Sequence, residues 1–119
     1  MNAEIRDRLT AAGADPDSAI ARFMGNEGMY QKFALKFLDD KNYETLVNAL
    51  ESGDAKSAFE AAHTLKGVAG NLSFQALGEA VSELVEPLRA GDLEGAREKL
   101  PEFTRCYEEI VEILREWKA

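Results

Sequence analysis

Apolar residues recur three and four positions apart along most of this chain, whereas the alternation of apolar and polar residues that marks β-strands is nearly absent. The β-branched residues are outnumbered by Ala, Leu, Glu and Lys. The clearest apolar stripes are Leu46, Val47 and Leu50; Leu77, Val81, Leu84 and Leu88; and Phe103, Tyr107, Ile110 and Leu114. The pattern predicts an all-α fold.

Short polar breaks divide the helical pattern at residues 13–16, 25–26, 39–42, 52–54, 73 and 91–92. They predict two short helices, then four longer segments at 27–39, 42–51, 54–72 and 74–90, and a last stretch at 92–118. Asp54 and Asp92 follow glycines, and each is expected to cap a helix by accepting hydrogen bonds from free amides of the first turn. Pro87 and Pro101 remove an amide donor, so we expect a kink or an early helix end near each, and the last stretch is open to division into two helices.

The connections between these segments are short, which favours antiparallel neighbours. We therefore expect an antiparallel up-and-down four-helix bundle with short N-terminal capping helices. Residues 1–119 are expected to form one domain, with the cap in residues 1–25 and the bundle in residues 26–118. A hydrophobic content of 45% and a charged content of 30% allow both a buried core and a polar surface.

Charge and cysteine content exclude several classes of function. The formal net charge of −8 opposes binding to nucleic acid or to an anionic membrane, and no local basic patch offsets it. Cys106 is the only cysteine, which excludes an intramolecular disulfide and a cysteine-rich metal site, and we predict no metal site. No apolar run approaches the roughly 18 residues that span a bilayer, and residues 1–12 carry charges, so we expect a cytoplasmic location.

Residues 58–72 carry the most informative pattern. On a helix with about 100° per residue, their apolar side chains fall in a wedge about 120° wide that lies almost opposite His63. The wedge consists of Ala58, Ala61, Ala62, Leu65, Val68, Ala69 and Leu72. It predicts a buried face, and it therefore predicts that His63 faces water.

Gly67 and Gly70 follow His63 by one and two turns on this exposed face. Glycine inside a helix costs roughly 0.5–1 kcal/mol relative to alanine, so helix stability does not explain them. The absence of side chains at both positions would let the backbone of a partner approach the imidazole. A helix end near Gly67 is the structural alternative, but the apolar wedge continues in phase through Leu72 and favours a continuous helix.

Lys66 lies one turn after His63, where its ammonium is close enough to neutralise an anion attached to the imidazole. A phosphoryl group fits that anion. An exposed imidazole is largely unprotonated at pH 7 and can act as a nucleophile without a dedicated base. These residues indicate that a phosphohistidine can form at this position.

Residues 62–67, Ala-His-Thr-Leu-Lys-Gly, resemble the central motif Ala-His-x-Leu-Lys-Gly of the histidine phosphotransfer (HPt) domains of multistep two-component signalling. The resemblance extends upstream to residues 19–27 and downstream through Leu77 and Leu84, so it covers most of the chain. It implies that His63 is the phosphoryl acceptor. It also implies that the lysine and glycine of the motif assist the phosphate and admit a receiver domain.

The function implied by this resemblance is that of a phosphorelay intermediate. It would exchange a phosphoryl group between His63 and an aspartate of a response-regulator receiver domain. A sensor or hybrid histidine kinase would be a further partner. The Mg²⁺ ion would come with the receiver domain, and the chain would hold no cofactor and show no independent turnover. We expect a monomer that binds neither nucleic acid nor a membrane.

The chain departs from the common family pattern at Val68, where many members have a small hydroxyl residue, and at Ser73, where many have glycine. Some members also place a Gln or Glu from the following helix against the imidazole. The corresponding region here offers Val85 and Glu86, and Glu60 is a second candidate for orienting the ring.

Residues 29–38 spread apolar side chains over more than half of a helix circumference. Two interpretations are equally open: a helix packed on two sides, or an exposed docking surface. In the second hypothesis Met29 or Phe33, together with Met24 and Phe59, forms an apolar rim around His63 that docks the partner.

Other classes of function have less support. The sequence has no Gly-rich phosphate cradle, no second histidine for a metal pair, and no serine or cysteine with an evident base, so a hydrolase that uses His63 as a general base is unsupported. A non-phosphorylated helical-bundle adaptor or kinase inhibitor is the main alternative. Acid-labile phosphate on the protein would distinguish a phosphorelay intermediate from both.

Overall fold

The computed structural model describes residues 1–119, and all of its regular elements are helical. The chain begins with two short helices, α1 (Ala3–Ala11) and α2 (Pro16–Arg22). It continues through α3 (Glu27–Lys36), the 3₁₀ turn η1 (Phe37–Asp39), α4 (Asn42–Ser52), α5 (Ala55–Asn71), α6 (Gln75–Arg89) and α7 (Leu93–Lys118). None of these helices combines the length and the hydropathy needed to cross a membrane. The predicted all-α class is confirmed.

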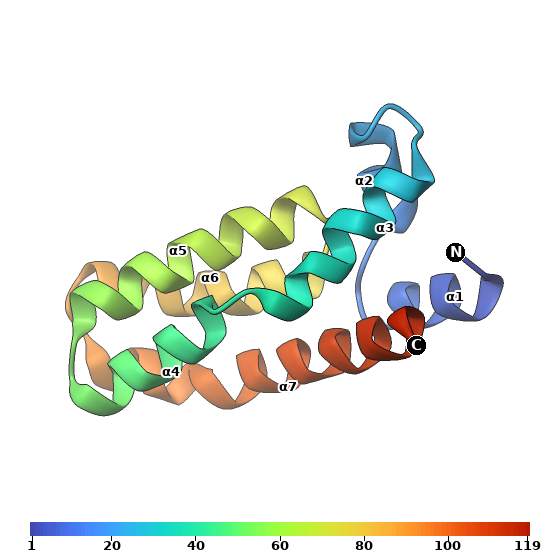
Figure 1. Ribbon diagram of the computed structural model, residues 1–119. Helices are drawn as coiled ribbons and strands as arrows, with labels where there is room; N and C mark the ends of the chain where they lie inside the picture. Colours follow the sequence, from blue (N-terminus) through green and yellow to red (C-terminus); the bar gives the residue numbers. More distant parts are fainter.

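The bundle is built from successive helices that pack as neighbours, as Figure 1 shows. Helix α5 lies against both α4 and α6, and α6 lies against α7. Helix α3, η1 and α4 follow one another along the bundle, so the expected segment 27–39 is an α-helix that tightens into a 3₁₀ turn. Helices α1 and α2 lie at the end of the bundle where the C-terminus also lies. The predicted antiparallel bundle with N-terminal capping helices is confirmed.

Two carboxylates cap the helices that they were predicted to cap. Asp54 precedes α5 and accepts hydrogen bonds from the Ser57 amide at 3.0 Å and the Ser57 hydroxyl at 2.7 Å. The bonds from Ser57 lower the pKa of the Asp54 carboxyl below its usual value. Asp92 precedes α7 and accepts from the Gly95 amide at 2.9 Å. These caps begin both helices directly after a glycine.

Helix α7 runs unbroken from Leu93 to Lys118, so the early helix end considered at Pro101 is wrong and the last stretch is one helix. Pro101 is exposed, and water can therefore hydrate the carbonyl of Arg97, which a proline cannot pair. The buried stripe that follows Pro101 holds the helix against the bundle, and burial there outweighs the cost of the proline. Pro87 lies in the last turn of α6, which ends at Arg89, so the early end expected there is confirmed.

The hydrophobic core lies between the inner faces of α4, α5, α6 and α7. Helix α5 contributes mainly alanine, and Leu65 is the one large side chain among its buried residues. The neighbouring helices contribute larger side chains, among them Leu46, Leu50, Leu77, Leu84, Phe103 and Leu114. Small residues on α5 allow its neighbours to approach its backbone closely. This packing fixes which face of α5 points into the core.

The N-terminal segment is fastened to the turn between α5 and α6. The Asp15 amide donates to the Ser73 carbonyl at 2.8 Å, and the Ala76 amide donates to the Gly13 carbonyl at 3.0 Å. Both bonds join residues far apart in the sequence. They therefore fix the position of α1 and α2 relative to the bundle.

Arg22 and Ser73 explain why this turn tolerates a residue other than glycine. Ser73 is buried and has a φ of 55°, in the left-handed region that favours glycine. Its hydroxyl accepts a hydrogen bond from Nη1 of Arg22 at 2.6 Å. The same nitrogen lies 3.0 Å from the Gly70 carbonyl and 3.3 Å from the Asn71 carbonyl, at the C-terminal end of α5. The Arg22 contacts therefore offset the backbone cost at Ser73.

Replacing Arg22 with alanine is expected to lower the free energy of unfolding by about 1–2 kcal/mol, because the buried Ser73 hydroxyl loses its hydrogen-bond partner. The double variant Arg22→Ala/Ser73→Gly should recover part of this loss, since glycine has no hydroxyl and adopts a positive φ without steric cost. Urea unfolding of the four proteins of this cycle measures both effects. Equal stability of the wild type and Arg22→Ala would contradict the role given to Arg22.

Candidate functional site

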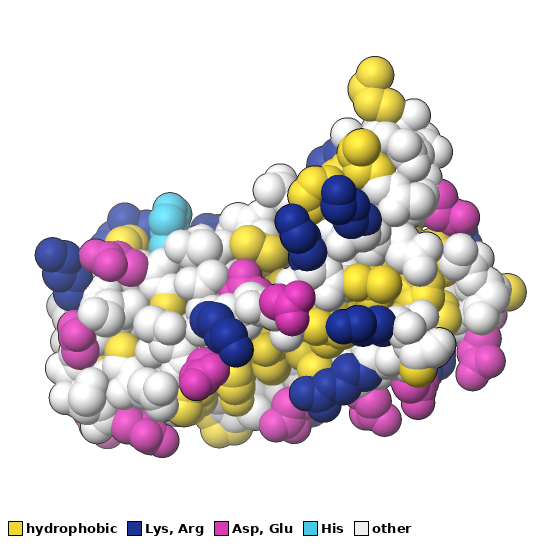
Figure 2. All heavy atoms as spheres, viewed as in Figure 1, with side chains coloured by type: hydrophobic (Ala, Val, Ile, Leu, Met, Phe, Trp, Pro, Cys, Tyr) yellow, Lys and Arg dark blue, Asp and Glu magenta, His cyan; other side chains and the backbone are white.

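Helix α5 presents two chemically different faces. The predicted wedge is buried, with Val68 half-buried at its edge. The opposite face exposes His63, Lys66, Gly67 and Gly70 to solvent. Figure 2 shows the histidine side chain at the molecular surface. The predicted exposure of His63 is confirmed.

The exposed backbone after His63 carries no side chain at Gly67 and Gly70. A Cβ atom at Gly67 or Gly70 would meet no atom within 4 Å outside the backbone of its own helix. Helix α5 continues past both residues to Asn71, so neither glycine ends the helix. No packing contact within this chain requires a glycine at either position. The open space beside the imidazole is therefore available to another molecule.

The imidazole of His63 stacks on the ring of Phe59, one turn earlier on α5. The ring centroids are 5.7 Å apart, and the ring planes differ by 13°. The guanidinium carbon of Arg89, on α6, lies 5.0 Å from the centroid of the Phe59 ring, which is the geometry of a cation–π contact. Nε of Arg89 donates to Oε2 of Glu86 at 3.3 Å. These contacts connect the C-terminal turn of α6 to the exposed histidine.

Neither carboxylate expected to orient the imidazole forms a hydrogen bond with it. Glu86 is exposed and pairs with Arg89. Glu60 is also exposed, and its carboxylate forms no ion pair. Val85, the other residue offered by this region of the sequence, is buried in the core. Orientation of the imidazole by Glu60 or Glu86 stays a prediction.

Lys66 is exposed on α5 one turn after His63 and forms no ion pair within the chain. It lines a polar groove of 530 Å³ between α5 and α6, together with Gly70, Gln75, Gly78, Glu79 and Ser82. An unpaired ammonium on the same helix face as the imidazole can neutralise an anion bound there. The position of Lys66 therefore agrees with its predicted role, which stays a prediction.

The residues of the predicted apolar rim lie in two places. Phe59 contacts His63, whereas Met24 lies in the turn between α2 and α3, and Met29 and Phe33 lie on α3. Met24 is 94% exposed, Met29 is 45% exposed and Phe33 is 41% exposed. Helix α3 packs against α2 and α7 and buries Tyr30, while it leaves Met29 and Phe33 partly exposed, so neither interpretation of residues 29–38 excludes the other. Figure 2 shows hydrophobic and basic side chains together on this projecting end of the molecule.

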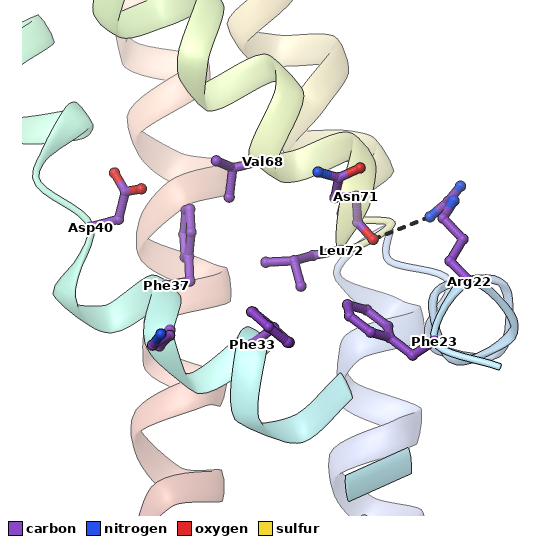
Figure 3. A pocket seen from close by; sticks show the side chains of 9 residues that line it. Arg22, Phe23, Phe33, Phe37, Asp40, Val68, Asn71 and Leu72 are labelled. Atoms are coloured by element: carbon purple, nitrogen blue, oxygen red, sulfur yellow. Dashed lines mark hydrogen bonds between the residues drawn. The ribbon is translucent and has the colours of Figure 1, made fainter. Parts of the chain in front are cut away.

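Phe33 also lines a pocket of 440 Å³ where α3 meets the C-terminal half of α5 (Figure 3). It stacks on Phe23, with ring centroids 5.4 Å apart. The pocket is completed by Arg22, Lys36, Phe37, Asp40, Val68, Asn71 and Leu72. Val68 follows His63 by five residues, which is a rise of about 7.5 Å along the helix axis. Because Val68 belongs to the apolar wedge, the pocket opens on a different face of α5 from the histidine, about one and a half turns further along the helix.

Cys106 and Trp117 both pack inside the molecule and take no part in the face around His63. Cys106 is buried, and burial raises the pKa of its thiol. Trp117 is half-buried and packs against Tyr30, with ring centroids 6.1 Å apart. No three His, Cys, Asp or Glu side chains are grouped so that they could hold a metal ion.

Arg89 was not identified from the sequence, although a signal for it exists. Phe59 and Arg89 each lie fifteen residues from Phe74, the N-cap residue of α6 in the α5–α6 hairpin. Residues at equal distances from the turn of an antiparallel hairpin lie opposite one another. Once the turn had been located, this register would have predicted the contact between Phe59 and Arg89.

Replacing Gly67 with alanine is expected to raise the free energy of unfolding by about 0.5–1 kcal/mol, because alanine is the better helix former and its Cβ meets only open space. Gly13→Ala is the matched control. It should destabilise the protein, since Gly13 has a φ of +84° and its new Cβ would clash with Ala76. Urea unfolding of both variants is the measurement. A destabilised Gly67→Ala protein would show that the fold itself requires this glycine.

A family model described as Hpt domain matches residues 40–113 of this chain. The matched region runs from the residues before α4 into α7 and contains His63, Lys66, Gly67 and Gly70. No curated protein and no solved structure matches the chain. The match covers more than half of the sequence, and α1, α2 and α3 lie outside it. The chain therefore belongs to the Hpt domain family, whose members carry out histidine phosphotransfer in phosphorelays.

Proposed function

We propose that this chain is a phosphorelay intermediate that accepts a phosphoryl group on His63 and exchanges it with an aspartate of a response-regulator receiver domain. One observation carries this proposal. The only histidine of the chain is exposed within the family-matched region, and the backbone at Gly67 and Gly70 is open beside it. A surface of this kind allows a second protein to bring a phosphoryl donor to the imidazole.

The reaction forms one bond and breaks another. The lone pair of an unprotonated ring nitrogen of His63 attacks the phosphorus of an aspartyl phosphate, and an N–P bond forms. The P–O bond breaks, and its electron pair returns to the aspartate carboxylate, while the proton on the other ring nitrogen leaves to solvent. Because the transfer is in-line, positioning and charge neutralisation make the main contributions. The receiver domain is proposed to bring the Mg²⁺ ion.

Lys66 is proposed to stabilise the transferred phosphoryl group. Its ammonium lies on the same exposed face as His63 and is not held by a carboxylate of this chain. A hydrogen bond between a cation and a phosphoryl oxygen is stronger than one between neutral groups. Lys66 therefore neutralises part of the negative charge of the phosphoryl group, which the acidic protein would otherwise repel.

The exposed apolar residues Met24, Met29 and Phe33 are proposed to dock the same receiver domain. Phe33 lines the pocket that reaches α5 at Val68, Met29 lies one turn before Phe33 on α3, and Met24 lies in the turn that leads into α3. Arg22, Lys36 and Asp40 line this pocket, so it combines an apolar surface with a net positive charge. A receiver domain that presents an apolar side chain next to acidic residues would complement both.

We further propose that residues 1–119 act as one monomeric domain in the cytoplasm, without a cofactor of its own and without independent turnover. The hydrogen bonds that residues 15 and 22 donate to Ser73, and the bond that the Gly13 carbonyl accepts from Ala76, support joining the cap of residues 1–25 to the bundle of residues 26–118. A sensor or hybrid histidine kinase is the proposed source of phosphoryl groups upstream of the receiver domain.

Incubation with a phosphorylated receiver domain and Mg²⁺ should transfer radiolabelled phosphate to the wild-type protein as an acid-labile adduct. His63→Gln should take up no label, because the acceptor nitrogen is lost. Lys66→Gln should take up label about tenfold more slowly, since a charge-assisted contact to the phosphoryl group is removed. Labelling of His63→Gln would contradict the proposal, and an unlabelled wild type would favour a non-phosphorylated adaptor or kinase inhibitor.

Replacing Phe33 or Met24 with aspartate should raise the receiver concentration needed for half-maximal transfer by about tenfold, because the docking surface loses an apolar anchor and gains a repelling charge. Lys99→Gln, at an exposed position of α7, changes the net charge by the same amount on a helix that carries neither His63 nor these apolar residues, and it serves as the control. Transfer rates measured over a range of receiver concentrations give the comparison. Equal effects of all three substitutions would exclude a specific docking role.

A further inference from the structure

The imidazole of His63 has no hydrogen-bond partner, and it extends from the exposed face of α5. A side chain in this situation rotates about both of its torsions unless another contact restrains it. The ring of Phe59 supplies such a contact. It lies nearly parallel to the imidazole, with a centroid separation of 5.7 Å and planes 13° apart.

Phe59 is itself held on two sides. Its ring is half-buried and packs against the hydrophobic core, which limits its own rotation. The guanidinium of Arg89 lies over the ring, with its central carbon 5.0 Å from the ring centroid. Glu86 pairs with Arg89 and restrains the guanidinium in turn. Core packing on one side and the Arg89 guanidinium on the other therefore both limit the motion of the stacked ring.

We propose that Phe59 is a positioning residue that orients the imidazole of His63 by stacking, in place of a hydrogen bond from a carboxylate or amide. Arg89 and Glu86 act through Phe59 by holding its ring. This inference rests on the proposed function of His63 as a phosphoryl acceptor. It gives Phe59 a role in orientation rather than docking, and it gives Glu86 an indirect role rather than a direct contact with the imidazole.

Orientation matters here because the attacking nitrogen has to point along the line of the bond that breaks. A freely rotating imidazole spends only part of its time in that direction. Stacking on Phe59 raises this fraction for any phosphoryl donor, whether protein or small molecule. A docking residue, by contrast, contributes only when the donor is a protein that touches it.

The small donor phosphoramidate therefore separates the two roles, because it has no docking surface. Phe59→Leu keeps an apolar side chain against the core but removes the aromatic ring. It should take up phosphate from phosphoramidate about fivefold more slowly than the wild type. A similar loss of maximal rate is expected with the phosphorylated receiver domain, at an unchanged half-maximal concentration. Phe59→Tyr retains the ring and should restore both rates.

The NMR spectrum of the unphosphorylated protein gives an independent readout of the stack. The ring protons of His63 should carry a ring-current shift in the wild type and in Phe59→Tyr, and this shift should be lost in Phe59→Leu. Circular dichroism confirms that each variant is folded. Glu86→Gln tests the alternative in which Glu86 contacts the imidazole directly. In that case Glu86→Gln would lower the maximal transfer rate, and Phe59→Leu would leave it unchanged.

Three outcomes would overturn the inference: equal uptake from phosphoramidate by wild type and Phe59→Leu, a change in half-maximal receiver concentration alone, or no ring-current shift in the wild type. The failure of the proposed function looks different. In that case the receiver domain would not label the wild type at all, while the NMR comparison would still decide whether Phe59 orients the imidazole.

Discussion

The alanine packing of α5 fixes the direction in which His63 points. Ala58, Ala61, Ala62 and Ala69 are buried, and their small side chains allow the neighbouring helices to approach closely. Rotating the helix by one residue, about 100°, would expose these alanines and move charged or polar side chains toward the core, where burial without partners is costly. The phase of the helix is therefore set by its buried face. This phase places His63, Lys66 and the two glycines Gly67 and Gly70 together on the opposite, exposed face.

The charge distribution around His63 differs from that of the chain as a whole. The chain has a formal net charge of −8, but near His63 the charges are balanced. Lys66 follows the histidine by one turn and Arg89 lies over Phe59, while Glu60 and Glu86 supply two carboxylates. A transferred phosphoryl group would add further negative charge to an acidic molecule. Cations on the same face reduce that repulsion locally.

Much of this organisation could be predicted from the sequence, because it depends on local periodicity. The buried wedge of α5, the exposure of His63 and the caps at Asp54 and Asp92 all follow from residues within a few turns of one another. The continuity of α7 through Pro101 could not be predicted, since it depends on burial against other helices. The left-handed Ser73 likewise depends on Arg22, which is far away in the sequence. The contact of Arg89 with Phe59 required the register between two helices.

The central claim is that the phosphoryl group is bonded to a nitrogen of His63. Because this is the only histidine, protein labelled with ¹⁵N in histidine alone makes the assignment unambiguous. After incubation with a phosphorylated receiver domain and Mg²⁺, the ³¹P NMR spectrum should contain a protein signal split by one-bond coupling to nitrogen. A protein-bound phosphorus signal without that coupling would place the phosphate on a carboxylate or hydroxyl group and contradict the claim.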